Sequence, residues 1–225
     1  MRDIHQNEIA FLGKITAGAT HEMKNILAII QESSGLMEDL MTLTPQVSVH
    51  QDKIQRALAT ISAQVKRGVE LSTRLNQFAH STDIPARPIS PLETTALIVE
   101  LAGRFARLKN VTLSSRPPEP DDAADRLTTR PIRLQMVLLT AIECWLDLSS
   151  PGQRIFVYPV KQERAFLFVV ECQGGPAADD PALQTLPRWP VLQDMIAGLD
   201  GQLEVANAPP RILICLSDVK TINGD

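Results

Sequence analysis

Residues 12–40 read LGKITAGATHEMKNILAIIQESSGLMEDL, and their apolar side chains recur at steps of three and four. That spacing places them on one face of an α-helix, because a helix completes a turn about every 3.6 residues. The same period extends over about residues 6–43 and predicts one long amphipathic helix. Its apolar seam comprises Leu12, Ile15, Ala19, Met23, Ile26, Ile30, Met37 and Leu40.

A second long helix is predicted after a short break. Residues 42–52, TLTPQVSVHQD, contain Pro45 and interrupt the helical pattern. Two helices joined by a short turn predict an antiparallel hairpin, which alone leaves part of both apolar stripes uncovered. A second copy would bury them in a four-helix bundle, so we expect a homodimer. The second stripe comprises Ile54, Leu58, Ile61, Val65, Ser72, Leu75 and Ala79.

The remainder of the chain predicts a different architecture. Residues 80–93, HSTDIPARPISPLE, contain three prolines and indicate a linker. Beyond it, segments of helical period and of alternating period predict helices on a mostly antiparallel sheet, an α+β sandwich. The expected domains are 1–82 and 90–225. The expected helices are 92–108, 131–148 and 188–199, the strands 111–115, 154–160, 165–172, 202–207 and 211–217, and the exposed acidic loop PPEPDDAAD at 117–125.

Composition excludes several classes of function. The hydrophobic fraction of 44% is enough for a buried core, while 22 basic against 26 acidic residues give no electrostatic basis for binding nucleic acid. No run of 18 apolar residues predicts a membrane span, and the start MRDIHQNEIA lacks the apolar core of a signal peptide. Cys144, Cys172 and Cys215 stand singly in apolar segments, which is typical of buried thiols. We therefore expect a cytoplasmic protein.

His21 lies on the opposite side of the first helix from the seam. At 100° per residue it falls about 200° from the centre of that stripe, so it should face solvent. A neutral imidazole is a good nucleophile near pH 7, and the carboxylate of Glu22 could accept its N–H. Lys24 could offset the charge of a phosphoryl group, and Asn25 could orient a water. By position alone, a solvated surface residue is the more common case for such a histidine, and its neighbours favour the chemical role. Its face is otherwise small or polar, which leaves room for a partner protein: Lys14, Ala17, Gly18, Asn25, Ala28 and Glu32.

The segment ITAGATHEMKNILAII, residues 15–30, resembles the phosphoacceptor box of bacterial two-component histidine kinases. In that box a histidine is followed by an acid, an apolar residue, a basic residue and Asn or Thr, as at positions 21–25 here. The resemblance implies that His21 accepts phosphate, with Glu22, Lys24 and Asn25 assisting it. The family's proline shortly after the box is replaced here by Ile26 and Leu27, which implies a less kinked helix.

The second domain resembles the ATPase domain of these kinases, with its nucleotide site degenerate. RLQMVLLTAIECWLDL, residues 133–148, is similar to the helix that carries the family's Mg²⁺-binding asparagines, yet Thr140 and Cys144 occupy those positions. Neither replaces an asparagine, because Mg²⁺ prefers hard oxygen ligands. In VVECQGGPAADD, residues 169–180, Cys172 stands where the family has an adenine-binding Asp, and the Gly174–Gly175 pair breaks the family's glycine spacing. The glycine-rich lid over the phosphates has no counterpart.

This combination is most similar to dimeric histidine phosphotransferases, which keep the hairpin and a degenerate, non-binding kinase-like domain. It implies a phosphotransferase that relays phosphoryl groups between receiver-domain aspartates through His21, and not an autonomous ATP-dependent kinase. The expected partners are receiver domains of response regulators or of a hybrid kinase. We expect no cofactor or metal in this chain, because the receiver supplies Mg²⁺. The alternatives are a catalytically silent scaffold or regulator that binds a response regulator, and a phosphatase in which Asn25 places a water.

Overall fold

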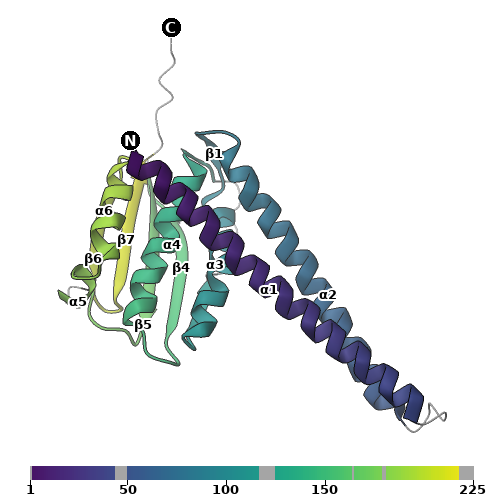
Figure 1. Cartoon of the computed structure of the whole chain (residues 1–225). Coiled ribbons are helices and arrows are strands. Elements are labelled where there is room, and N and C mark those ends of the chain that lie inside the picture. Colours follow the sequence, from purple (N-terminus) through teal and green to yellow (C-terminus); the bar gives the residue numbers. More distant parts are fainter. Residues whose placement is uncertain (1, 44–49, 117–124, 164, 179–180, 218–225) are drawn as a thin grey trace. The chain divides into compact units, whose positions relative to one another are not determined.

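The computed structural model describes residues 2–43, 50–116, 125–163, 165–178 and 181–217. The chain divides into two compact units, and Figure 1 labels their elements. One unit is helical and covers Gly13–Gln77, whereas the other begins at Phe78 and includes the chain up to Leu12. The first turns of the chain belong to the unit that begins at Phe78 because they contact residues of that unit. Glu8 Oε1 lies 3.3 Å from Arg133 Nε, and the ring of Phe11 packs edge-on against that of Phe78 with centroids 5.5 Å apart.

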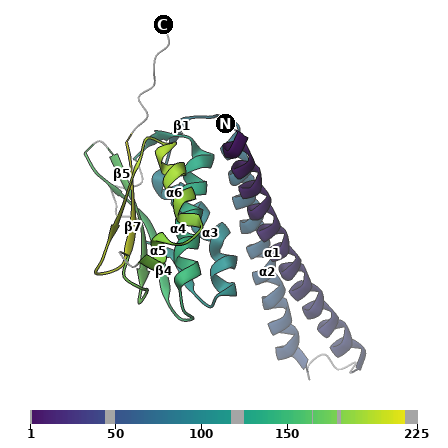
Figure 2. The same ribbon diagram turned by 60° about the vertical axis from the view of Figure 1, so that its left-hand side comes forward.

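The helical hairpin is formed by α1 (Arg2–Leu43) and α2 (Gln51–Ala79), which run antiparallel (Figures 1 and 2). The seam predicted on α1 is its covered face, since Ile15 and Ile26 are each only 1% exposed. Gly68 of α2 lies close against this seam. A Cβ placed on it would already contact Ile26 Cγ2 at 3.6 Å and Met23 Sδ at 3.9 Å. Both are ordinary van der Waals distances, so an alanine would also fit at this position.

The stripe predicted on α2 is only partly covered within a single chain. Ala57, close to the stripe, is buried, and the stripe residue Ile61 is half-buried. Four other stripe positions are exposed, in line with the expectation that one hairpin leaves part of its apolar surface uncovered: Leu58, Val65, Ser72 and Ala79. Val69, which the prediction omitted, is 61% exposed.

The second unit is a two-layer α+β sandwich. Its five-stranded sheet has the order β2-β4-β5-β7-β6, with β2 and β4 parallel and the other pairs antiparallel. Helices α3, α4 and α6 cover one face of the sheet (Figure 2). The bounds are α3 Pro91–Leu108, β2 Thr112–Ser115, α4 Pro131–Leu148, β4 Arg154–Lys161, β5 Ala165–Gln173, α5 Pro181–Gln184, α6 Arg188–Ala197, β6 Gln202–Ala206 and β7 Arg211–Ser217. The fold class predicted from the sequence is confirmed.

Alternation along the strands builds the core between the sheet and its helices. The helix-facing residues of the three central strands are completely buried: Ile155, Val157, Phe168, Val170, Ile212 and Ile214. Side chains of successive strand residues point to opposite faces, so their neighbours in sequence line the other side of the sheet. Trp145 of α4 ties the two layers together, because its Nε1–H donates to the carbonyl oxygen of Val170 at 2.8 Å.

The predicted linker holds more structure than its prolines suggested. Arg87–Ile89 forms β1, which pairs antiparallel with β3 (Leu127–Thr129) as a separate two-stranded sheet, and His80–Thr82 forms a short 3₁₀ helix. Ser90 then caps α3 by accepting a hydrogen bond from the backbone N–H of Glu93 at 3.2 Å, with Pro91 in the first turn. Most of the predicted acidic loop, residues 117–124, lies outside the described residues.

Candidate functional site

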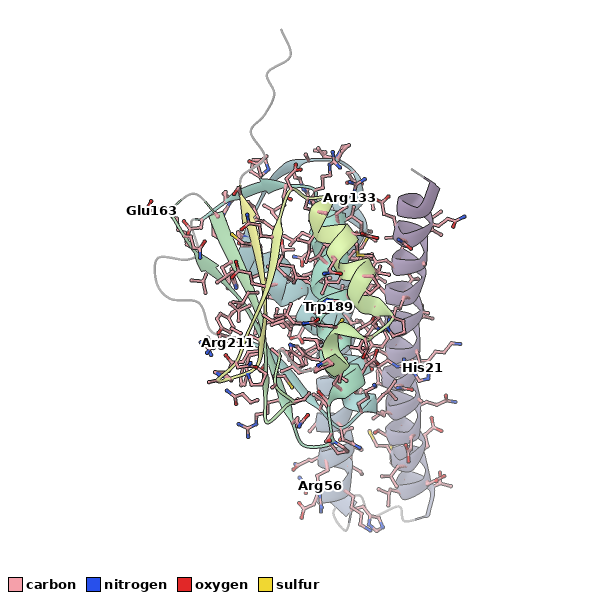
Figure 3. All side chains as sticks on the ribbon, turned by 90° about the vertical axis from the view of Figure 1, so that its left-hand side faces the viewer. His21, Arg56, Arg133, Glu163, Trp189 and Arg211 are labelled. Atoms are coloured by element: carbon pink, nitrogen blue, oxygen red, sulfur yellow. The ribbon has the colours of Figure 1, made fainter. Side chains whose placement is uncertain are left out.

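His21 lies near the middle of α1 on the exposed side of that helix. Figure 3 shows its side chain projecting outward from the helix. The seam residues Ile15 and Ile26 fix the rotation of α1, because burying them leaves the opposite face in water. Lys24 and Asn25 are exposed as well. The structure therefore presents an imidazole, an amine and an amide together on one accessible stretch of helix.

Glu22 is bound in a way that the sequence did not predict. Its carboxylate forms an ion pair with the guanidinium of Arg67 on α2. The side chain of Glu22 is only 13% exposed, whereas that of Arg67 is 45% exposed. Arg67 thus holds the carboxylate of Glu22 between the two helices. A search for neighbours within one helix could not find this residue, because the two partners are 45 positions apart.

The predicted partner surface around His21 is exposed at most of its positions. Ala17, Ala28 and Glu32 are exposed, and Lys14 is half-buried. Gly18 is buried, contrary to the expectation that it lies open. A residue without a side chain is readily covered by the larger side chains around it. Gly18 can therefore offer little surface of its own to a partner.

On α4, the two positions that resemble those of the kinase asparagines pack against other side chains of this protein. Cys144 is completely buried, and burial raises the pKa of its thiol to about 12. The hydroxyl of Thr140 lies 3.8 Å from the sulfur of Met195 on α6. A buried, protonated thiol and a hydroxyl packed against a thioether are poor Mg²⁺ ligands.

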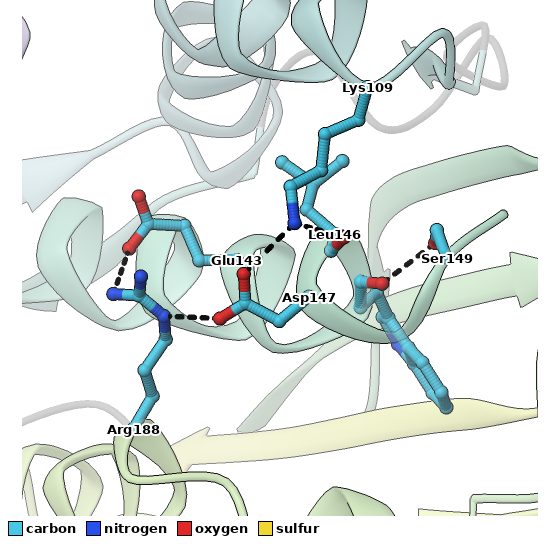
Figure 4. A network of polar contacts seen from close by, with 7 residues as sticks. Lys109, Glu143, Leu146, Asp147, Ser149 and Arg188 are labelled. Atoms are coloured by element: carbon cyan, nitrogen blue, oxygen red, sulfur yellow. Dashed lines mark hydrogen bonds and ion pairs between the residues drawn. The ribbon is translucent and has the colours of Figure 1, made fainter. Parts of the chain in front are cut away.

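A network of charged groups lies on the same helix (Figure 4). Arg188, at the start of α6, donates to Asp147 at 2.7 Å and to Glu143 at 2.9 Å. Lys109 donates to Asp147 at 3.1 Å and to the carbonyl oxygen of Leu146 at 2.8 Å. Burial alone would raise the pKa of Asp147, but the hydrogen bonds from Arg188 and Lys109 outweigh it and lower that pKa. Two cations thus neutralise the carboxylates of α4 from within the chain.

The stretch that resembles the adenine-binding motif is closely packed. Cys172 is completely buried, and burial raises its pKa. A Cβ placed on Gly175 would lie 2.6 Å from Cys172 Sγ, so the backbone of this glycine packs directly on the thiol. Gly174 has φ +76°, a conformation that favours glycine. In this chain the two glycines serve a tight turn and a close contact.

Trp189 is buried, with 7% of its surface exposed. It lines a shallow hollow of about 480 Å³ between α5, α6 and the edge strand β6. The hollow's other residues are Gln184, Gln193, Leu203, Glu204 and Val205. Neither Thr140 nor Cys172 contributes to it.

Two further features bear on the kind of protein. In the part of the chain that the structure describes, no helix has both the length and the apolar character needed to cross a membrane. Among the same residues, no group of three or more His, Cys, Asp or Glu side chains is arranged to hold a metal ion.

Solved structures share this fold. The catalytic domain of the histidine kinase ThkA, in a nucleotide-free form, matches with a TM-score of 0.51 and 12% identity, over 60% of this chain and 98% of that domain. A second nucleotide-free form gives 0.50 and 12% identity, over 60% and 97%. The Acinetobacter baumannii histidine kinase AdeS covers 88% of this chain and 97% of its own at 13% identity, but its TM-score of 0.48 is too low to carry an argument. The sequence itself matches no family model and no curated protein. The chain thus contains the fold of a histidine kinase catalytic domain.

Proposed function

We propose that the chain is a histidine-containing phosphotransferase of a bacterial two-component phosphorelay. In this role His21 takes a phosphoryl group from the aspartate of one receiver domain and passes it to another. The observation that carries the proposal is the exposed imidazole of His21, which Glu22 follows directly in the sequence and near which Lys24 and Asn25 are exposed on the same helix. A histidine kinase catalytic fold in the same chain supports a place in two-component signalling.

The chemistry follows from the groups around His21. One ring nitrogen attacks the phosphorus of the receiver's aspartyl phosphate, the phosphorus–oxygen bond breaks, and the aspartate leaves as a carboxylate. The other ring nitrogen keeps its proton, and Glu22 accepts that N–H, which stabilises the charged ring. Lys24 offsets the charge on the phosphoryl oxygens. Transfer to a second receiver reverses these steps, and the receiver supplies Mg²⁺ each time.

The second unit supports a relay without its own ATP. The kinase resemblance places the Mg²⁺ ligands on α4, where this chain has the buried Cys144 and the packed Thr140. Arg188 and Lys109 already satisfy the neighbouring carboxylates of that helix. Phosphate therefore enters from another protein.

Dimerisation would cover apolar side chains that a single hairpin leaves exposed. Part of the apolar surface of α2 is left uncovered by a single chain, with Leu58, Val65 and Val69 between 48% and 61% exposed. On α1, Leu27 is 56% exposed. Packing two hairpins into a four-helix bundle would bury these half-covered side chains, each at a gain of about 1 kcal/mol, since complete burial of a fully exposed one contributes about 1.5–3 kcal/mol.

Transfer from a phosphorylated receiver domain tests the proposal directly. We expect label on the wild-type protein, located on His21 by mass spectrometry, no label on His21→Ala, and normal label on the control His80→Ala. Absence of label on wild type, or equal label on His21→Ala, refutes it. Complex formation without label would favour the scaffold or regulator. Faster loss of receiver phosphate without phospho-His21 would favour the phosphatase, in which Asn25 is exposed to place a water.

A further inference from the structure

The open face of the five-stranded sheet carries a buried carboxylate. Glu171 lies on β5 among residues that point away from the helices, yet its side chain is only 1% exposed. Its cross-strand neighbours are Phe156 on β4 and Arg211 on β7. Figure 3 shows Arg211 on the side of the sheet opposite α6. Among the residues that the structure describes, the helices of this unit lie on the other face of the sheet (Figure 2), so the polar side chains around the carboxylate shield it from water.

Two arginines meet at one oxygen of this carboxylate. Arg116 Nη2 and Arg211 Nε each lie 3.2 Å from Glu171 Oε2, and the hydroxyl of Tyr158 donates to the same atom at 3.2 Å. Gln173 Nε2 donates to the other oxygen at 3.0 Å. The guanidinium of Arg116 also stacks 4.0 Å above the ring of Tyr158. A buried carboxylate, an aromatic ring and two sheet strands therefore fix both guanidinium groups side by side.

Each guanidinium keeps donors that this cluster does not use. Arg116 contacts Glu171 through Nη2, and Arg211 does so through Nε, with no other hydrogen bond from either group in the described part of the chain. A guanidinium has five N–H donors in a fixed plane. The two side chains are 47% and 35% exposed, so the remaining donors are accessible to a ligand.

The charges of the cluster favour an anion. Two guanidinium groups face one carboxylate, which leaves one positive charge in excess. Arg154 on β4 and Glu204 on β6 are also exposed on this face, and their charges offset each other. A phosphate anion complements the remaining positive charge. Its closely spaced oxygens can accept hydrogen bonds from two guanidinium groups held around one point.

We propose that Arg116 and Arg211 form a binding site for a phosphate anion, free or as a monoester, on the open face of the sheet. Glu171 positions the two guanidinium groups and does not itself touch the ligand. Holding the receptor groups in place before binding removes much of the entropy cost of ordering them. This site shares no residue with the His21 site or with the charged groups of α4. Its test therefore does not depend on the phosphotransfer proposal.

Inorganic phosphate is the first probe, titrated against the full-length protein at constant ionic strength with chloride as the replaced anion. Two-dimensional NMR of the backbone amides and arginine side chains follows the titration. We expect a saturable response centred on residues 116, 158, 171 and 211. Arg116→Ala and Arg211→Ala should each weaken binding about tenfold or more, because each removes charge-assisted hydrogen bonds. Arg104→Ala on α3 is the matched control and should bind as wild type.

The outcomes distinguish a phosphate ester from free phosphate as the ligand, and they define the results that contradict the proposed site. Tighter binding of adenosine monophosphate than of phosphate, with the same arginine dependence, assigns the site to a phosphate ester, and equal binding assigns it to free phosphate. A non-saturable response, or one that Arg104→Ala weakens as much as Arg211→Ala does, overturns the proposal. Arg211→Lys provides a second variant in case Arg211→Ala does not fold. Lysine retains the positive charge but lacks the planar guanidinium with its paired N–H donors, so we expect intermediate binding. Wild-type affinity in a folded Arg211→Ala protein would also overturn it.

Discussion

Exchanging the charges of Glu22 and Arg67 would separate two roles of their ion pair. One role is to stabilise the hairpin, and the other, under the proposed function, is to position the carboxylate of the residue that follows His21. Arg67→Ala tests both at once, because it leaves Glu22, with its side chain 13% exposed, without this partner. The double variant Glu22→Arg/Arg67→Glu restores an ion pair between the helices. It also replaces the carboxylate next to the imidazole with a guanidinium.

The stability effect should be small. Ion pairs near the surface contribute about 0.2–1 kcal/mol, and the 45% exposure of Arg67 places this one toward the lower end. For a chain of this length 1 kcal/mol corresponds to about 2–4 °C, so Arg67→Ala should lower Tm by no more than that. The charge exchange should recover most of the loss. Urea and thermal unfolding followed by circular dichroism measure both variants.

The effect on phosphotransfer should be larger and should not recover. Misplacing a group that orients a reacting side chain can lower a rate about 10²-fold. We expect about a tenfold loss for Arg67→Ala, in which Glu22 remains but is no longer held, and at least about a hundredfold loss for the exchange. Single-turnover transfer from a phosphorylated receiver domain provides the rate. Arg56→Ala, an exposed arginine three turns earlier on α2, is the matched control.

The reasoning fails if the exchange restores stability and transfer rate together, since the ion pair would then act only through the fold. It also fails if Arg67→Ala transfers phosphate as fast as Arg56→Ala. A normal rate in Glu22→Gln would remove the carboxylate from the chemistry altogether.

Three further predictions follow from burial and charge. Val69→Asp places a charge on the uncovered apolar surface of α2 and should convert a dimer to a folded monomer, measured by light scattering; an unchanged mass contradicts the bundle. Because burial raises the pKa of Cys144 to about 12, this thiol should resist alkylation at pH 8 while the half-exposed Cys215 reacts; mass spectrometry of the native protein decides, and equal labelling is the opposing result. The pKa of Asp147 is lowered in the fold, so its stabilisation is present above about pH 4 and is lost as pH falls below that. Urea unfolding of Arg188→Gln should therefore show its largest deficit at pH 7 and a smaller one at pH 3, whereas an equal deficit at both would contradict the ion pair.

Most secondary structure was predictable because its signals are local. The predicted helix at 131–148 has the bounds of α4, since Pro131 sets its first turn and a run of apolar residues continues it. Strand alternation placed β4, β5 and β7 within a residue of their bounds. The short strand β1 was missed because Pro88 argues against a strand, and only pairing with β3 across 40 positions stabilises it.

The sequence by itself determined which face of α1 carries His21, because the period of its apolar residues fixes the rotation of the helix. It also determined that a helical hairpin precedes an α+β sandwich. Only the tertiary structure decided which charged side chains meet. Arg67 pairs with Glu22, Arg188 pairs with Asp147, and both Arg116 and Arg211 pair with Glu171. These pairs form because folding packs segments that lie far apart in the chain against one another. Such pairs leave no periodic signal in a sequence, because the two charged groups become neighbours only in the folded chain.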